Sequence, residues 1–195
     1  MQRVGMDVSA PALRAAGLLL LIFAAGLLAG CASSPPPGAP PPGGVWYTQS
    51  TLQYEQGRYR TTNYRRGFVL PVNTKVTLGS MDEDEIVVRV VDSGAELTVD
   101  NVPKHTNDTT LGAFGKLFAA APADLSRFSE SEQQAIRAGH AEVGMTRDAV
   151  LAALGHPPAV GTPLLDEPVW KYWDSRFTTF VVRFDGSGHV VEAGR

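Results

Sequence analysis

The pattern of apolar and polar positions predicts strands in the first half of the folded chain. Between residues 45 and 104, short apolar runs alternate with polar positions at a period of two, as in residues 74–78 and 97–99, while residues 86–91 form a nearly continuous apolar run. A period of two is typical of half-buried strands. Glycine, aspartate and serine separate these runs and favour tight turns. We expect three or four short antiparallel strands that form a small sheet or partial barrel.

The period becomes helical from residue 109. Leu111, Phe114, Leu117 and Phe118 fall on one face of a helix, and Lys116 lies off that face. An apolar stripe of this kind is far more often part of a hydrophobic core than a lipid-binding or partner-binding surface. The segment therefore predicts a short helix within a β-rich domain that spans residues 45–125.

Two further helices are predicted by their end signals. Ser129 and Glu132 have the spacing of a capping box, in which each side chain bonds the backbone of the other residue, and the helix that follows ends at Gly139. Thr146 is placed as the N-cap of a second helix, which ends at Gly155 before two prolines. The narrow apolar stripe of this helix has to be covered by another element.

Three strands follow these helices and supply that cover. Residues 169–173 and 177–184 alternate as paired strands, and a Gly-Ser-Gly turn leads to a third strand at residues 189–192. Two helices followed by a three-stranded antiparallel meander form an α+β unit with both helices on one face of the sheet. The expected fold class is therefore α+β, with this unit at residues 126–195 preceded by the small β-rich domain.

The start of the chain predicts a lipid anchor. An apolar run at residues 18–30 ends in Leu28-Ala29-Gly30-Cys31, which looks like a bacterial lipobox, and Cys31 is the single cysteine. We expect residues 1–30 to be a signal peptide and Cys31 to carry a diacylglyceryl group and an N-acyl chain. The alternative is an ordinary transmembrane helix with an incidental thiol, but the run is shorter than the ~20 residues that span a bilayer. Two or three acyl chains hold a protein on its membrane.

A proline- and glycine-rich segment at residues 31–44 follows the anchor. Such runs favour the extended polyproline II helix, so this segment is interpreted as a tether that reaches roughly 30 Å. A ligand for a proline-binding groove is the alternative. Ala32 follows the cysteine, at the position where aspartate would retain lipoproteins of the enterobacterial type in the inner membrane. The absence of aspartate favours the outer membrane.

Composition and charge exclude several functions. The chain has 195 residues with 17 lysines and arginines against 20 acidic residues, and it offers no basic patch for nucleic acid. The acidic run at residues 82–85 lacks the ligand spacing of a calcium loop and favours a solvated turn. His105, His140, His156 and His189 are scattered and are interpreted as loop or surface residues. Because no metal-site, nucleophile or phosphate-loop motif occurs, we expect neither catalysis nor a non-covalent cofactor.

The C-terminal part resembles the SmpA/OmlA (BamE-like) lipoprotein family. The resemblance rests on the entry Gly144-Met145-Thr146, the exit Leu154-Gly155 followed by Pro157, and the strands that carry Trp170, Tyr172 and Phe184. It covers residues 129–193, a third of the chain. It implies an outer-membrane lipoprotein that acts as an accessory in β-barrel protein assembly or envelope integrity. Some 80 residues separate the lipid cysteine from this part, whereas the family usually has a short linker.

The aromatic strand supplies a candidate surface for a partner protein. Trp170 and Tyr172 share one face of the strand, and Trp173 takes the other. One set packs under the helices, and the hypothesis is that Trp173, with nearby Arg176, belongs to a partner-binding surface. The alternative is that all three rings are buried. Two other functions stay open, an inhibitory or binding module for another periplasmic protein and a receptor for a cell-wall ligand.

Overall fold

The computed structural model describes residues 1, 2, 5 and 34–194, and residues 34–195 form one compact unit. Apart from residues 1, 2 and 5, the predicted signal peptide lies outside the described residues, and so does the lipobox Leu28-Ala29-Gly30-Cys31. Within the part that is described, no helix is both long enough and apolar enough to cross a bilayer.

The first half of this unit is built on a six-stranded sheet with the order β3-β7-β6-β5-β1-β8. Its strands are β1 (Val45–Thr48), β3 (Arg58–Arg60), β5 (Lys75–Met81), β6 (Glu85–Val90), β7 (Glu96–Asp100) and β8 (Phe118–Ala119), while β2 (Leu52–Tyr54) and β4 (Phe68–Leu70) form a separate pair. The expectation of three or four antiparallel strands was wrong, because β3 runs parallel to β7. Short strands such as β3 span too few residues to show a period.

Alternation along these strands builds the first hydrophobic core. Val76 and Leu78 on β5 lie opposite Val90 and Val88 on β6, and all four are buried. The acidic run forms the turn between β5 and β6, where the Asp82 carboxylate accepts hydrogen bonds from the backbone N–H groups of residues 84 and 85. The acidic residues of this turn are partly or fully exposed, while apolar residues of the flanking strands lie in the core.

Two short helices follow β7, and α3 packs against the sheet. Thr109 caps α3 (Thr110–Leu117) by accepting from the N–H of Gly112, and Phe114 packs edge-on against Trp46 with a centroid distance of 4.8 Å. The helix α2 (Pro103–Thr106) was not predicted. Phe118, predicted in the helix, has an extended backbone and begins β8, because its partner Thr48 on β1 offers a strand edge.

The second half confirms the predicted helix and strand order. It contains α4 (Glu130–Ala138), α5 (Arg147–Leu154) and an antiparallel sheet of β9 (Val169–Trp173), β10 (Thr179–Phe184) and β11 (Val190–Ala193), in the order β11-β10-β9. The Ser129–Glu132 capping box and the Thr146 N-cap are both present. The chain is therefore a mixed helix and sheet protein with a three-stranded antiparallel sheet in its C-terminal part.

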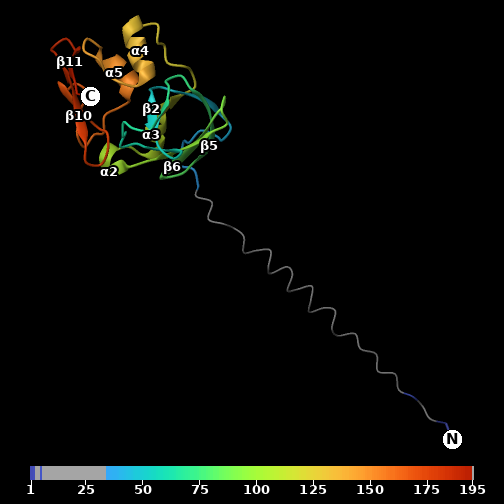
Figure 1. Ribbon diagram of the computed structural model, residues 1–195. Coiled ribbons are helices and arrows are strands. Elements are labelled where there is room, and N and C mark those ends of the chain that lie inside the picture. The colour runs from blue at the N-terminus through green and yellow to red at the C-terminus, as the bar shows by residue number, and fades with distance from the viewer. Residues whose placement is uncertain (3–4, 6–33, 195) are drawn as a thin grey trace. The chain divides into compact units, whose positions relative to one another are not determined.

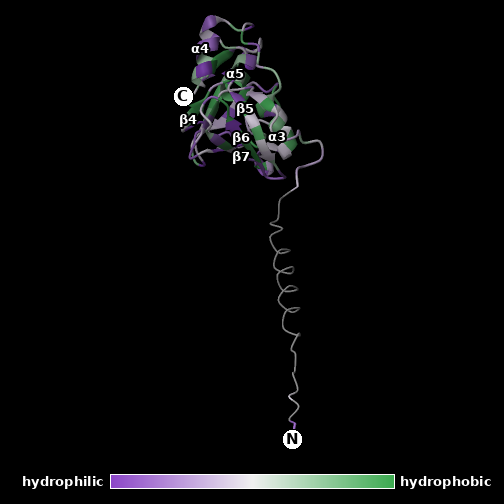
Figure 2. Ribbon diagram, turned by 90° about the vertical axis from the view of Figure 1, so that its right-hand side faces the viewer, coloured by the Kyte–Doolittle hydropathy of each residue, from purple (hydrophilic) through white to green (hydrophobic). Residues whose placement is uncertain are grey.

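A second hydrophobic core lies between the helices and this sheet. Trp170 and Tyr172 from β9 and Ile136 from α4 are fully buried there, with Val150 and Leu154 from α5. On α4 only Ala135 and Ile136 are buried, and Figure 2 shows most of that helix as hydrophilic. One face of β9 thus packs under the helices, as the alternation predicts.

Arg65 joins the two halves. Its guanidinium is fully buried and donates to the carbonyl oxygens of Gly139 at the end of α4 and of Ala153 and Leu154 at the end of α5, at 3.1 to 3.2 Å. It also donates to the Thr51 carbonyl at 3.0 Å. A cation is favourable at helix carboxyl ends, where backbone carbonyls lack helical partners. Figure 1 shows α5 between the C-terminal sheet and β2, where these contacts form.

The proline- and glycine-rich segment differs from the expected free tether. Ala39 packs against the first core, and the N–H of Gly43 donates to the Leu78 carbonyl at 2.7 Å. A turn at residues 36–39 brings the segment onto the sheet, since the N–H of Ala39 bonds the Pro36 carbonyl. Residues 36–44 therefore extend the folded part, and an extended spacer would be confined to the residues before them.

Candidate functional site

The candidate site is a cavity of about 400 Å³ at the junction of the two halves. Tyr59 on β3 and Thr61 just after it form one side, and residues 106–108 and α3 form another. The third side is the loop of residues 156–165, which leaves α5 at Gly155 and runs to β9. The cavity thus collects side chains that are more than a hundred positions apart in the sequence.

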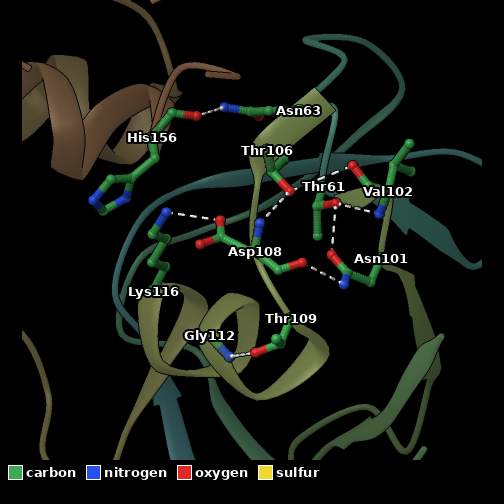
Figure 3. Close-up of polar contacts among 10 residues, drawn as sticks. All are labelled: Thr61, Asn63, Asn101, Val102, Thr106, Asp108, Thr109, Gly112, Lys116 and His156. Carbon is green, nitrogen blue, oxygen red and sulfur yellow. Dashed lines mark hydrogen bonds and ion pairs between the residues drawn. The ribbon is translucent and has the colours of Figure 1, made fainter. Parts of the chain in front are cut away.

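A hydrogen-bond network fixes the segment between α2 and α3. Asn101 donates to the Asp108 carbonyl at 3.0 Å and accepts from the Thr61 hydroxyl at 3.2 Å. The Thr61 oxygen in turn accepts from the N–H of Val102 at 2.8 Å. Figure 3 shows these bonds holding Asp108 beside the start of α3. The backbone of Asp108 is therefore held in place by this network.

Asp108, Lys116 and His156 form the charged edge of the cavity. The Lys116 ammonium lies 2.7 Å from an Asp108 carboxylate oxygen, and the His156 ring lies beside this pair (Figure 3). Burial lowers the pKa of His156, and the neighbouring Lys116 charge lowers it further, whereas Asp108 raises it. The imidazole is consequently neutral near pH 7. His156, expected as a loop or surface residue, is in a loop but faces this cavity.

Two hydroxyl groups in the wall carry no hydrogen bond within residues 34–194. Tyr59 is 3 % exposed and Ser50 is 4 % exposed, and both line the cavity. Burial raises the pKa of Tyr59 to about 12, although the Arg65 charge acts to lower it. The phenol therefore keeps its proton at neutral pH. Neither oxygen is fully shielded from solvent, so both can bond a molecule in the cavity.

A second hollow adjoins the first. It has a volume of about 430 Å³ and shares Ser50, Lys116 and His156 with the cavity. Its far end reaches Arg127 and Asp148, which form an exposed ion pair at 3.2 Å. Only this second hollow also touches α5, through Leu151 and Ala152.

The residues predicted to bind a partner lie elsewhere. Trp173 is half-buried on the outer face of β9, where a Cβ added at Gly161 would come within 2.4 Å of its ring. Arg176 is exposed in the turn between β9 and β10, next to Phe177, which is 90 % exposed. The partner-binding role of Trp173 and Arg176 stays a prediction.

Comparison of the chain with protein-family models, with curated proteins and with solved structures finds no match. The sequence pattern does not predict the cavity, because it indicates only that Tyr59 belongs to a strand and that Lys116 is a polar position on a helix. Its nearest signal in the sequence is the long proline-rich loop of residues 156–168.

Proposed function

We propose that the protein is a lipid-anchored lipoprotein of the SmpA/OmlA type, held at the outer membrane on its periplasmic face. There it acts as a non-catalytic, protein-binding accessory in outer-membrane protein assembly or envelope integrity. The observation that carries this proposal is the sequence Leu28-Ala29-Gly30-Cys31 directly after an apolar run. Acylation of Cys31 would anchor the compact unit of residues 34–195 to a membrane.

The C-terminal architecture supports the family part of the proposal. Two capped helices followed by a three-stranded antiparallel sheet form the unit that the resemblance implies. In the turn after β9, Phe177 is 90 % exposed next to Arg176, and aromatic and arginine side chains often anchor protein interfaces. We assign the partner surface to Trp173, Arg176 and Phe177 and name it the hairpin surface.

The anchor is tested by replacing Cys31 with serine in the full chain expressed in a Gram-negative bacterium. Metabolic labelling with an alkyne-bearing palmitate and membrane fractionation measure the outcome. We expect the wild type to be labelled and to sediment with outer membranes, and C31S to be unlabelled. A Ser33→Ala variant serves as the matched control. Equal labelling and sedimentation of C31S would overturn the proposal.

The partner is tested by photocrosslinking from position 176 in living cells, with position 137 on the exposed face of α4 as control. Adducts with the β-barrel assembly complex from position 176 would support the proposed accessory role. A soluble periplasmic protein as the main adduct would instead indicate the binding or inhibitory module. Retention on peptidoglycan sacculi without protein adducts would indicate the cell-wall receptor.

A further inference from the structure

We propose that the cavity between β3, α3 and the loop of residues 156–165 is a binding site for a small aliphatic carboxylate. The carboxylate would be held by Lys116 and the hydroxyl of Tyr59, and its alkyl part would lie against Leu117, Pro157 and Ala159. This site is distinct from the hairpin surface and does not depend on the lipid anchor.

Lys116, Tyr59 and Ser50 each keep a hydrogen-bond donor available in the cavity. Lys116 has three N–H bonds and is bonded to one carboxylate, that of Asp108. The Tyr59 hydroxyl is protonated and is not bonded within residues 34–194, and the same holds for the Ser50 hydroxyl. Three donors beside one positive charge favour a ligand with accepting oxygens, and a carboxylate accepts at two oxygens.

The charge balance selects among anions. Asp108 lies within ion-pair distance of Lys116, so its negative charge offsets most of the attraction for a second anion. A dianion such as a phosphate monoester would be repelled more strongly by Asp108 than a monoanion. His156 is neutral there and adds no positive charge. A singly charged head group therefore fits this edge best.

Apolar side chains form much of the remaining wall of the cavity, beside the polar Thr61, Thr106, Asn107 and Thr162. Ala113 and Leu117 face it from α3, and Pro157, Ala159, Pro163 and Leu165 face it from the loop. Ligand sites commonly combine such a wall with a few placed polar groups, and their volumes begin near ~300 Å³. At about 400 Å³, this cavity has room for a short alkyl chain.

The test is titration of the full chain, in neutral detergent micelles, with hexanoate as the probe. Isothermal titration calorimetry gives the affinity, and hexanamide and hexylamine serve as matched probes without a carboxylate. We expect saturable binding of hexanoate alone. Lys116→Met should weaken it by roughly tenfold or more, since a charge-assisted bond is lost. Tyr59→Phe, which removes only the hydroxyl, should weaken it by roughly threefold to tenfold.

Two controls separate this site from other causes. Lys75→Met removes an exposed lysine on β5 and should leave hexanoate binding unchanged. If Tyr59→Phe fails to fold, Ser50→Ala tests the same set of hydroxyls. The proposal is overturned if hexanoate does not bind, if hexanamide binds equally well, or if Lys116→Met binds hexanoate as tightly as the wild type. The last result is the one expected if hexanoate merely partitions into the micelle.

Discussion

Replacing Arg65 should destabilise the whole compact unit. Its guanidinium donates to the carbonyls of Thr51, Gly139, Ala153 and Leu154, and the side chain is fully buried. Bonds from a charged donor contribute about 1.5–3 kcal/mol each, and a buried acceptor left without its donor costs about 1–3 kcal/mol. In Arg65→Met, the Leu154 carbonyl keeps a hydrogen bond from the Asn63 side chain. The carbonyls of the other three residues lose the donor that Arg65 supplies. We expect a loss of about 4 kcal/mol or more in the free energy of unfolding.

The neighbouring arginine provides the matched control. Arg66 is half exposed and pairs with Glu55 at 2.7 Å, so Arg66→Met should cost about 1 kcal/mol or less. Arg65→Lys should fall between the two, because an ammonium keeps the charge but not the fork that reaches both helix ends. Urea unfolding of the full chain, followed by tryptophan fluorescence and by circular dichroism, measures these differences. Equal stabilities of Arg65→Met and Arg66→Met would refute the reasoning.

Two smaller changes test the ends of the helices. Burial acts to raise the pKa of Glu132, but bonds from the N–H groups of Thr146 and Ser129 lower it below its ordinary value. The stability that this carboxylate contributes is therefore present above the ordinary carboxyl pKa and is lost as the pH falls through the lowered pKa. Glu132→Gln should cost about 1 kcal/mol in the free energy of unfolding at pH 7 and less in acid, which urea titrations at both pH values measure. Similar losses at the two pH values would contradict this prediction. Gly155 has a φ of +75°, and an added Cβ would lie 3.2 Å from the Ser50 hydroxyl. Gly155→Ala should lower the free energy of unfolding by about 1–3 kcal/mol. Gly115→Ala, at an open position of α3, should raise it by about 1 kcal/mol. Thermal melting that finds Gly155→Ala to be the more stable of the two variants would contradict the strain argument.

The parts of the fold that the sequence predicted are those set by local physics. The caps at Ser129 and Thr146 need only residues within one helical turn, and the alternation of β9 places Trp170 and Tyr172 on the buried face. Phe118 was misplaced because an apolar residue after a helix fits either a further turn or a strand. The strand forms because Phe118 pairs with Thr48, which lies seventy residues earlier in the chain.

The junction between the halves could not be predicted, because it depends on polar residues that carry no periodic signal. In the sequence, Arg65 belongs to a polar run before Gly67, which is typical of an exposed turn. Its burial requires carbonyls from Gly139 and Leu154, which only the folded chain brings together. The cavity has the same origin, since Tyr59, Lys116 and His156 meet only across this junction.

A junction held by directed hydrogen bonds has a consequence for ligand binding. Arg65 fixes the ends of α4 and α5 by geometry, so the loop that leaves α5 meets β3 without packing closely against it. That leaves a hollow in which the Tyr59 and Ser50 hydroxyls stay without protein partners. A ligand that bonds Tyr59 and lies against Pro157 would bridge the two halves and favour the folded state in proportion to its occupancy. Hexanoate at saturating concentration should therefore raise the unfolding midpoint of the wild type more than that of Lys116→Met.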